Sequence, residues 1–168
     1  LGVFGEAANS VGGYLAGAVP TTGSNARQLF EQPRRAYVLV NLEPEFDCAN
    51  PALAAKALAQ ADLVVALSAY RYGPLGHADV MLPIAPFTET AGTFINCEGR
   101  VQSFNGVVRP LGETRPGWKV LRVLANMLGL PGFDFDTAEA VRDAVLGRAG
   151  ADISSRMANE LDWPLAAP

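Results

Sequence analysis

The stretch AYVLVNLEPEFDCANPALAAKALAQADLVVAL, residues 36–67, carries the pattern that decides the fold. It opens with a short apolar run at 36–41 and closes with a second one at 62–67. Continuous apolar runs of this length are typical of strands that are buried in a sheet. Between them, Asn50 and Pro51 predict a helix start, with Asn as the N-cap and Pro at the first helical position. A strand, a helix and a strand in this order predict a parallel sheet with right-handed crossovers.

The sequence on the C-terminal side extends this unit. Residues 79–83 predict a third strand. A later segment changes character, because two short apolar runs flank the turn Asn96-Cys97-Glu98-Gly99, in which Asn opens and Gly closes the turn. We therefore predict an α/β fold, namely a three-layer Rossmann-like unit with a short parallel sheet, a β-hairpin and C-terminal helices. The predicted strands lie near 36–41, 62–67 and 79–83, and the hairpin near 93–104.

Helix signals complete the predicted organisation. A short helix is expected at about 9–18, and a second one is expected after Ser24 as its cap. A longer helix begins at Pro116 and ends before Gly129, with an apolar face formed by Trp118, Leu121, Leu124, Ala125 and Leu128. Asp136 and Glu139 form a capping-box pattern for a helix to about 146, and one more helix is expected from 149. Residues 1–130 are thus predicted to form an α/β domain and 131–168 a helical extension.

Composition excludes several classes of function. The 168 residues are 49% hydrophobic and 18% charged with a net charge of −4, which is typical of a globular protein. No basic cluster stands out, which argues against nucleic-acid binding. Two distant cysteines and one histidine argue against a disulfide framework, a zinc site or an iron–sulfur cluster held within the chain. No apolar run is long enough to span a membrane. The chain begins at Leu1 without Met, so we expect a piece of a longer protein.

The predicted sheet places polar residues beyond the carboxyl ends of its strands, where α/β folds bind ligands. The alternatives are solvated loops or a contact with the rest of the parent protein. Glu45 and Asp47 extend an acidic loop that suits either acid–base chemistry or simple solvation. Phosphate-loop, dinucleotide-loop and serine-elbow motifs are absent, so no catalytic residue and no metal ligand is predicted. The candidate cofactor-binding residues are Asn41, Glu43, Ser68, Tyr70, Arg71, Thr88 and Glu89.

The hairpin segment ETAGTFINCEGRVQSF, residues 89–104, resembles the E-x-x-G-T-x-x-N-x-E-x-R-x-Q signature of the molybdopterin oxidoreductase family. Segments 6–20, 77–87 and 115–130 resemble further motifs of that family, in the same order. The residues that match the hairpin signature are Gly92, Thr93, Asn96, Glu98, Gly99, Arg100 and Gln102.

Within the family, the phrases at 36–47 and 82–113 are most similar to the large iron–sulfur subunit of bacterial respiratory complex I. The resemblance implies a subunit of NADH-quinone oxidoreductase that supports electron transfer from NADH to quinone. It implies iron–sulfur clusters held by parts N-terminal to this chain. It also implies a peripheral position on the cytoplasmic face of the bacterial inner membrane. The implied partners are the other peripheral-arm subunits and the remainder of the same polypeptide.

Two departures from the family pattern bear on the cofactor. Glu43 stands where cofactor-bearing relatives usually have Asn, and Ala69-Tyr70-Arg71 replaces a Thr-Glu-Thr stretch. A carboxylate repels a pyrophosphate and offers no amide donor. We therefore expect a structural domain that binds neither molybdenum nor a pterin dinucleotide. The alternative is the cofactor-binding C-terminal part of an active molybdopterin oxidoreductase such as a formate dehydrogenase or nitrate reductase. A small-ligand-binding module is a third possibility.

Overall fold

The computed structural model describes residues 7–20, 22–71 and 76–148. The described residues form two compact units. The hairpin unit consists of 7–20, 92–104 and 136–148, and the sheet unit consists of 22–71, 76–91 and 105–135. The predicted domain boundary near residue 130 stays a prediction. It does not coincide with the limits of the two units, which lie at 21, 91, 104 and 135.

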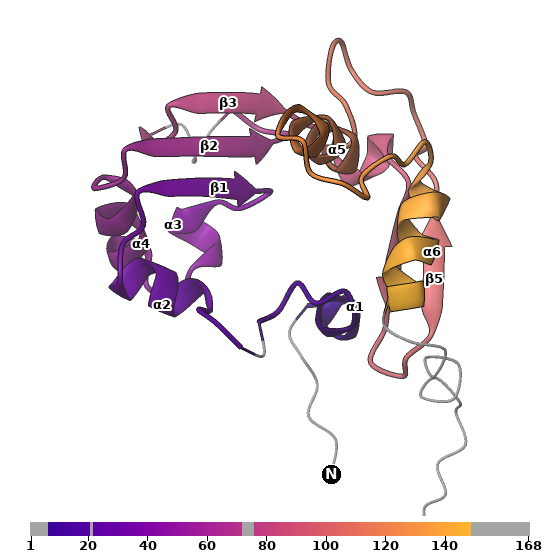
Figure 1. Cartoon of the computed structure of the whole chain (residues 1–168), viewed down its shortest axis with the longest axis horizontal. Helices are drawn as coiled ribbons and strands as arrows, with labels where there is room; N and C mark the ends of the chain where they lie inside the picture. Colours follow the sequence, from indigo (N-terminus) through magenta and orange to yellow (C-terminus); the bar gives the residue numbers. More distant parts are fainter. Residues whose placement is uncertain (1–6, 21, 72–75, 149–168) are drawn as a thin grey trace, which may run out of the picture. The chain divides into compact units, whose positions relative to one another are not determined.

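The sheet unit is built on three strands, β1 (Ala36–Val40), β2 (Leu63–Ser68) and β3 (Val80–Pro83), in the order β1-β2-β3. Both strand pairs are parallel, which confirms the prediction from residues 36–67 (Figure 1). Asp79 fixes the start of β3 against β2, because its Oδ2 accepts from the backbone N–H of Val64 at 2.7 Å. Its own N–H donates to the carbonyl of Val64 at 2.9 Å.

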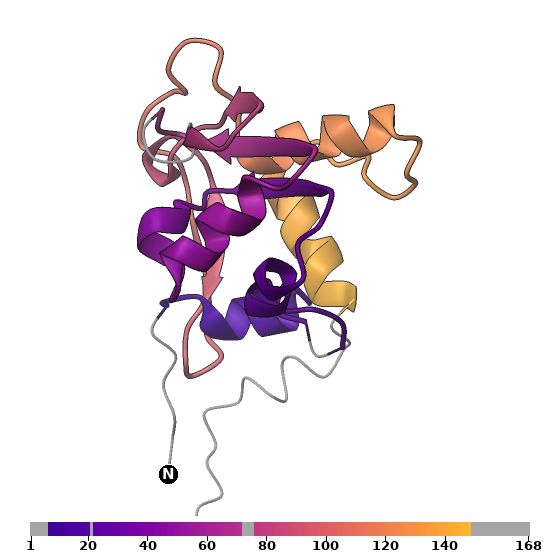
Figure 2. The ribbon, with the colours of Figure 1, turned by 90° about the vertical axis from the view of Figure 1, so that its left-hand side faces the viewer.

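One face of this sheet is covered by α2 (Ala26–Glu31) and α4 (Pro51–Leu58) (Figures 1 and 2). Asn50 caps α4 as predicted, with its Oδ1 accepting from the N–H of Leu53 at 3.0 Å. The cap of α2 is Asn25 and not Ser24, because Asn25 and Gln28 form a reciprocal capping box. The buried cluster between helices and sheet contains Phe30, Tyr37, Leu39, Ala54, Ala57, Leu58, Val64 and Ala66.

The opposite face of the sheet is only partly covered, which corrects the prediction of strands buried on both sides. Val38 and Val40 are 53% and 45% exposed, because both helices that flank β1 and β2 pack on the other face. Helix α5 (Gly117–Met127) packs only near the carboxyl end, where the ideal Cβ of Gly117 lies 3.4 Å from Ile84.

The predicted apolar face of α5 is confirmed only in part. Ala125 is 5% exposed, but Leu121 and Leu128 are 36% and 66% exposed. The helix is amphipathic, yet the described part of the chain provides little surface for it to pack against. Two shorter helices, α3 (Pro44–Asp47) and the 3-10 turn η2 (Phe87–Glu89), follow the ends of β1 and β3.

The hairpin unit contains α1 (Ser10–Leu15), α6 (Ala138–Arg148) and the antiparallel strands β4 (Gly92–Ile95) and β5 (Val101–Phe104). The side chain of Asn9, just before α1, accepts from the N–H of Ile95 at 2.8 Å and so joins helix and hairpin. Thr137 and not Asp136 caps α6, because its Oγ1 accepts from Ala140 N–H at 3.1 Å. The helix predicted from 149 lies outside the described residues.

The turn between β4 and β5 has the predicted chemistry. Oδ1 of Asn96 accepts from the N–H groups of Glu98 and Arg100 at 3.1 and 2.8 Å. Gly99 donates to the carbonyl of Asn96 at 2.9 Å and has φ +82°. A backbone in this left-handed region favours glycine, because a Cβ would be strained there.

Replacing Gly99 by Ala should therefore lower the free energy of unfolding by more than about 1 kcal/mol. Urea denaturation followed by circular dichroism measures this change. Gly147→Ala in α6 is the matched control, since no atom lies within 4 Å of its ideal Cβ and alanine favours helix. Equal stabilities for the Gly99→Ala variant and the wild type would show that the turn assignment is wrong.

Candidate functional site

The carboxyl ends of the three strands meet in one row, as predicted. Asn41 donates its N–H to the carbonyl of Leu67 at 2.8 Å, and Ile84 donates to Ser68 at 3.1 Å. The row continues beyond β3, because Ile84 forms an isolated parallel bridge with Arg115. We call this row the strand-end edge; it runs from Asn41 through Ser68 and Ile84 to Arg115.

The backbone of Asn41 is unusual at the start of this edge. Its φ is +52°, the one positive value that a non-glycine residue adopts in the described part of the chain. Asparagine tolerates this conformation better than most residues, and such positions cluster at functional sites. Asn41 is exposed, so its side-chain amide is accessible at the edge.

The end of the edge near β1 is acidic. The backbone N–H of Glu43 donates to Oδ2 of Asp47 at 2.7 Å, so this carboxylate holds the loop of α3 in place. Glu45 lies 3.7 Å from the imidazole Nε2 of His77. The geometry thus explains these carboxylates as loop-shaping groups as well as a source of negative charge.

A cavity of about 470 Å³ lies beside this loop, between α2, α3 and α4. Burial raises the pKa of the Cys48 thiol at its wall, and the carboxylates of Asp47 and Glu45 raise it further. A thiol with a raised pKa stays protonated at neutral pH and is a weak nucleophile. This cavity therefore offers no activated group.

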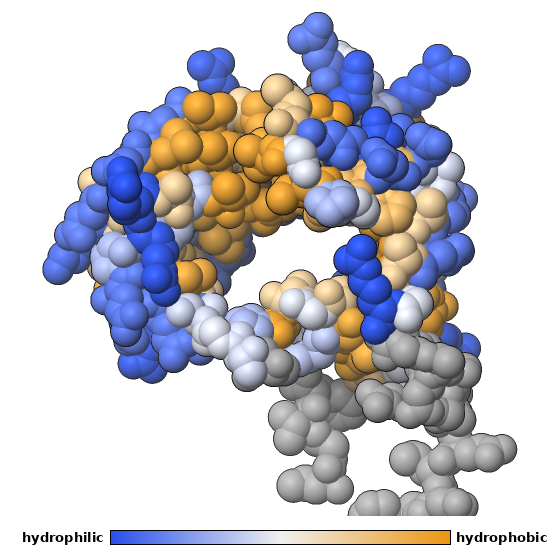
Figure 3. Space-filling view, in the orientation of Figure 1, coloured by the Kyte–Doolittle hydropathy of each residue, from blue (hydrophilic) through white to orange (hydrophobic). Residues whose placement is uncertain are grey.

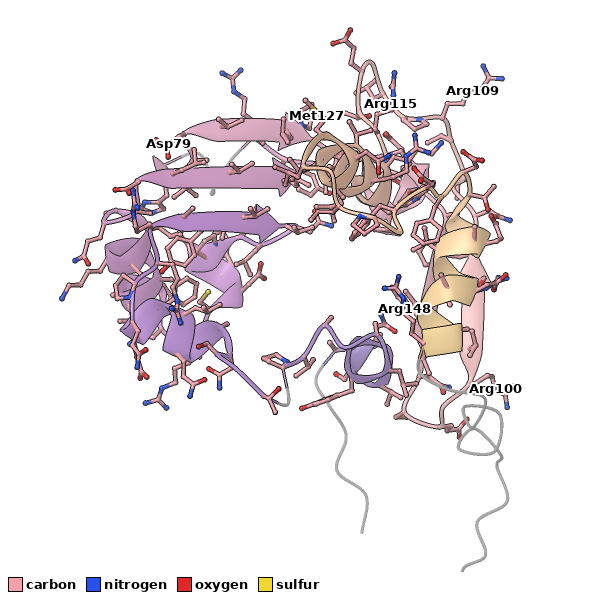
Figure 4. All side chains as sticks on the ribbon, in the orientation of Figure 1. Asp79, Arg100, Arg109, Arg115, Met127 and Arg148 are labelled. Carbon is pink, nitrogen blue, oxygen red and sulfur yellow. The ribbon has the colours of Figure 1, made fainter. Side chains whose placement is uncertain are left out.

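The other end of the edge is basic. A second cavity, of about 450 Å³, has a mostly apolar lining, and Leu82, Arg115, Lys119 and Arg122 are among the residues around it. The guanidinium of Arg122 donates to the carbonyl of Phe135. Arg115 is exposed, and Figure 4 labels it beside α5, on the side away from β3. The Nζ of Lys119 lies 5.3 Å from the centroid of the Trp118 ring. Arg71 is exposed after the end of β2 and adds a further cation.

Sequence reasoning missed this basic cluster. Lys119 and Arg122 are three residues apart on α5, and that signal was present in the sequence, whereas Arg115 lies before the helix. No local pattern indicated that Arg115 would pair with Ile84, because this bridge closes a loop of some thirty residues.

The remaining candidate residues, Ser68, Thr88 and Glu89, form hydrogen bonds that stabilise the loops around them. Ser68 is 4% exposed, and its Oγ accepts from the N–H of Tyr70 at 3.1 Å, which shapes the turn after β2. The carbonyl of Thr88 accepts from Val107 N–H at 2.7 Å. Oε2 of Glu89 accepts from Leu111 N–H at 2.9 Å, so Glu89 holds the loop that follows the hairpin.

The hairpin signature residues belong to the other unit, and their contacts are internal to it. The ideal Cβ of Gly92 would lie 2.5 Å from the ring of Phe104, so only glycine fits there. Oγ1 of Thr93 lies 3.0 Å from Oγ of Ser103. Asn96 and Gly99 form the turn, and Gln102 lies opposite Phe94 in the strand register.

Metal-ligating clusters and membrane-spanning helices are both absent from the described residues. No three His, Cys, Asp or Glu side chains in 7–20, 22–71 and 76–148 are grouped so as to hold a metal ion. Within the same ranges, no helix combines the length and the apolar character that crossing a membrane requires.

The comparison with known proteins points to the same family as the motifs in the sequence. Residues 1–127 match the molybdopterin oxidoreductase family. A protein of Staphylococcus haemolyticus named "putative formate dehydrogenase" is 30% identical over 115 residues, which cover 66% of this chain and 12% of that protein. Proteins with the same name from Staphylococcus aureus strains RF122 and USA300 are 36% identical over 93 and 94 residues. These alignments cover 52% and 53% of this chain, and 9% and 10% of those proteins.

The chain thus spans about a tenth of the length of the curated relatives that it matches. The family match includes parts of both units, from α1 to the last turn of α5. On this match and on the motifs in its sequence, the chain belongs to the molybdopterin oxidoreductase family.

Proposed function

We propose that this chain is a cofactor-binding part of a molybdopterin oxidoreductase of the formate dehydrogenase type. The strand-end edge would hold the nucleotide end of the cofactor. The observation that carries the proposal is that the family match includes the whole of this edge, from Asn41 to Arg115. The names of the Staphylococcus relatives support formate as the substrate of the whole enzyme.

The chemistry of the edge fits such a group. A pterin dinucleotide carries two phosphates, and the guanidinium groups of Arg71 and Arg115 are suited to phosphate recognition. The amide of Asn41 and the phenol of Tyr70, which is 60% exposed, offer hydrogen-bond donors and acceptors for the polar atoms of a nucleotide. We infer that the phosphates lie at the basic end of the edge.

The separation of charge along the edge weakens the case against a cofactor. A carboxylate about 4 Å from a phosphate costs about 4 kcal/mol at an effective dielectric of about 20. Neighbouring strands are about 4.8 Å apart, so three steps from β1 to Arg115 put Glu43 about 14 Å from the basic end. At that distance the repulsion is about 1 kcal/mol before screening by salt, which weakens it further. Glu43 is therefore compatible with a phosphate held by Arg115, three strand steps away. Arg71 follows β2, one step from β1, so a phosphate there would lie closer to Glu43.

The described residues would bind and orient the cofactor. Arg71 and Arg115 would neutralise the phosphates of the cofactor. The side-chain amide of Asn41, whose backbone φ is +52°, would hydrogen-bond a polar group of the nucleotide. A bound molybdenum centre would supply the two-electron redox step on the substrate. No group at the edge is proposed as an acid or a base.

The experiment compares arginine variants of the full-length protein that carries this chain. The double variant Arg71→Ala, Arg115→Ala should lose at least tenfold in the pterin nucleotide that is retained after purification. Arg35→Ala is the matched control: Arg35 is an exposed arginine that pairs with Asp62 at the opposite, amino-terminal end of the sheet. Equal nucleotide content in all three proteins would contradict the proposal.

A second candidate is a domain without a pterin cofactor in the large iron–sulfur subunit of respiratory complex I. The observation that favours it is the group of carboxylates Glu43, Glu45 and Asp47 at the end of β1, which no phosphate would approach readily. The wild-type protein distinguishes the two candidates, because only the first predicts a bound pterin nucleotide.

A further inference from the structure

The pair Asn105-Gly106 follows directly after β5 and is the one Asn-Gly pair in the sequence. A glycine after an asparagine leaves the side-chain amide open to attack by the next backbone nitrogen, because no Cβ shields that nitrogen. Residue 106 must be glycine, since an ideal Cβ there would lie 2.9 Å from the carbonyl carbon of Glu89 and 3.0 Å from the nitrogen of Thr90. The packing of this loop therefore maintains the reactive pair.

Both reacting groups are accessible. Asn105 and Gly106 are exposed, and within 7–20, 22–71 and 76–148 neither the side chain of Asn105 nor the N–H of Gly106 has a hydrogen-bond partner. No hydrogen bond to the described residues has to break before the nitrogen of Gly106 approaches Cγ of Asn105. Figure 3 shows hydrophilic side chains that stand out from the surface at the upper right, where the loop after β5 runs, and Figure 4 labels Arg109 of this loop pointing away from the ribbon.

The other described asparagines lack this combination. Asn41 is exposed, but the branched residue Leu42 follows it and hinders attack by the next backbone nitrogen. The remaining ones hold their side chains in hydrogen bonds, namely Asn9, Asn25, Asn50, Asn96 and Asn126. Asn105 is thus the described asparagine that joins an unbonded side chain to a following glycine.

We propose that Asn105 is a site of spontaneous deamidation. The nitrogen of Gly106 loses its proton to solvent and bonds to Cγ of Asn105, and the bond from Cγ to the side-chain nitrogen breaks. That nitrogen leaves as ammonia, with a proton taken from solvent, and a cyclic imide remains. Water then opens the imide at either carbonyl, which gives aspartate or isoaspartate. No atom is oxidised or reduced, because each conversion consumes one water molecule and releases one ammonia molecule.

The isoaspartate product alters the loop, because its backbone runs through Cβ and is one atom longer. The residues on both sides of the pair are fixed. Phe104 pairs with Gly92 in the hairpin, and the carbonyl of Thr88 accepts from the N–H of Val107 at 2.7 Å. The extra backbone atom has to displace one of these anchors. We expect the hydrogen bond from Val107 to break, since it is a single contact, whereas β5 is held by the whole strand pair.

The first measurement follows the chemistry in the full-length protein, which is incubated at neutral pH, sampled over time and digested with trypsin. Trypsin spares the Arg-Pro bonds after residues 109 and 115, so the peptide 101–119 contains Asn105 as its one asparagine, and the peptide 72–100 contains Asn96 as the internal control. The mass increase of an amide-to-acid conversion should appear in 101–119 at least tenfold faster than in 72–100. It should also proceed within tenfold of its rate in a synthetic peptide of residues 101–119. A smaller difference between the two tryptic peptides, or a slower reaction in the native protein, would overturn the proposal.

The second measurement tests the structural consequence by hydrogen exchange. The N–H of Val107 should exchange at least tenfold faster in molecules that carry isoaspartate than in fresh protein. Asn105→Gln is the matched control, because it keeps an amide but reacts through a larger ring that closes slowly, and its exchange should not change with incubation. Asn105→Asp adds the charge without the extra backbone atom and should exchange like fresh protein. Unchanged exchange in the isoaspartate form, or an equal increase in either variant, would contradict the expected displacement.

Discussion

Replacing Gly12 by Ala is expected to lower the free energy of unfolding by about 1–3 kcal/mol, although alanine is the better helix former. The reason is the packing of α1 against the hairpin. An ideal Cβ at residue 12 would overlap Oδ1 of Asn9, the atom that accepts the hydrogen bond from Ile95 N–H. Ile95 is 4% exposed, so its N–H would lose a partner that water cannot readily replace.

A double-mutant cycle tests this mechanism. Asn9→Ala alone should cost a similar amount, because it also leaves the N–H of Ile95 without its acceptor. In the Asn9→Ala background, Gly12→Ala should be neutral or stabilise by up to about 1 kcal/mol, since the clash is gone and helix propensity remains. Additive losses in the double variant would contradict this mechanism. The same contact explains why the segment at 9–12 requires both an Asn and a Gly.

Leu67→Ala should destabilise the sheet unit by about 2–5 kcal/mol, the range for a large-to-small change in a packed core. Leu67 is 1% exposed and lies in the middle strand, between Val40 and Leu82. Leu63→Ala in the same strand is the matched control. Leu63 is 42% exposed, so this substitution should lower the free energy of unfolding by less than half as much as Leu67→Ala does. Urea denaturation measures both, and equal losses would contradict the described packing.

Strong local signals made much of the fold predictable from the sequence. The apolar runs at 36–41 and 62–67 and the helix start at Asn50-Pro51 specify a strand, a helix and a parallel strand, and the structure has these elements within a few residues. The hairpin was predictable because Asn96 and Gly99 each meet a requirement of the turn itself. In both cases the decisive contacts are close in sequence.

The exact helix caps, the exposure of one sheet face and the bridge after β3 were not predictable. The caps of α2 and α6 shifted by one residue, because Asn25 and Thr137 compete with adjacent residues that have similar capping chemistry. The continuous apolar runs indicated buried strands, but α2 and α4 pack on one face and leave Val38 and Val40 on the other face exposed. The bridge between Ile84 and Arg115 joins segments that show no local preference for each other.

The candidate site was predictable in outline and not in its charge. The strand ends meet as expected, yet the expectation drawn from Glu43 assumed that no basic cluster in the chain compensates the phosphates, whereas Arg115 lies at the other end of the edge. Arg115 reaches the edge only through tertiary structure. Glu89 matched a family signature, but its carboxylate has a structural partner, the N–H of Leu111.

We propose that the full-length protein carrying this chain is a cofactor-binding molybdopterin oxidoreductase. The most direct test is the metal content of the full-length protein, purified from its own host and analysed by inductively coupled plasma mass spectrometry. We expect molybdenum or tungsten in stoichiometric amount, about one atom per polypeptide, lost together with the pterin on denaturation. Protein that is folded and pure but contains neither metal would contradict the claim and favour a cofactor-free domain.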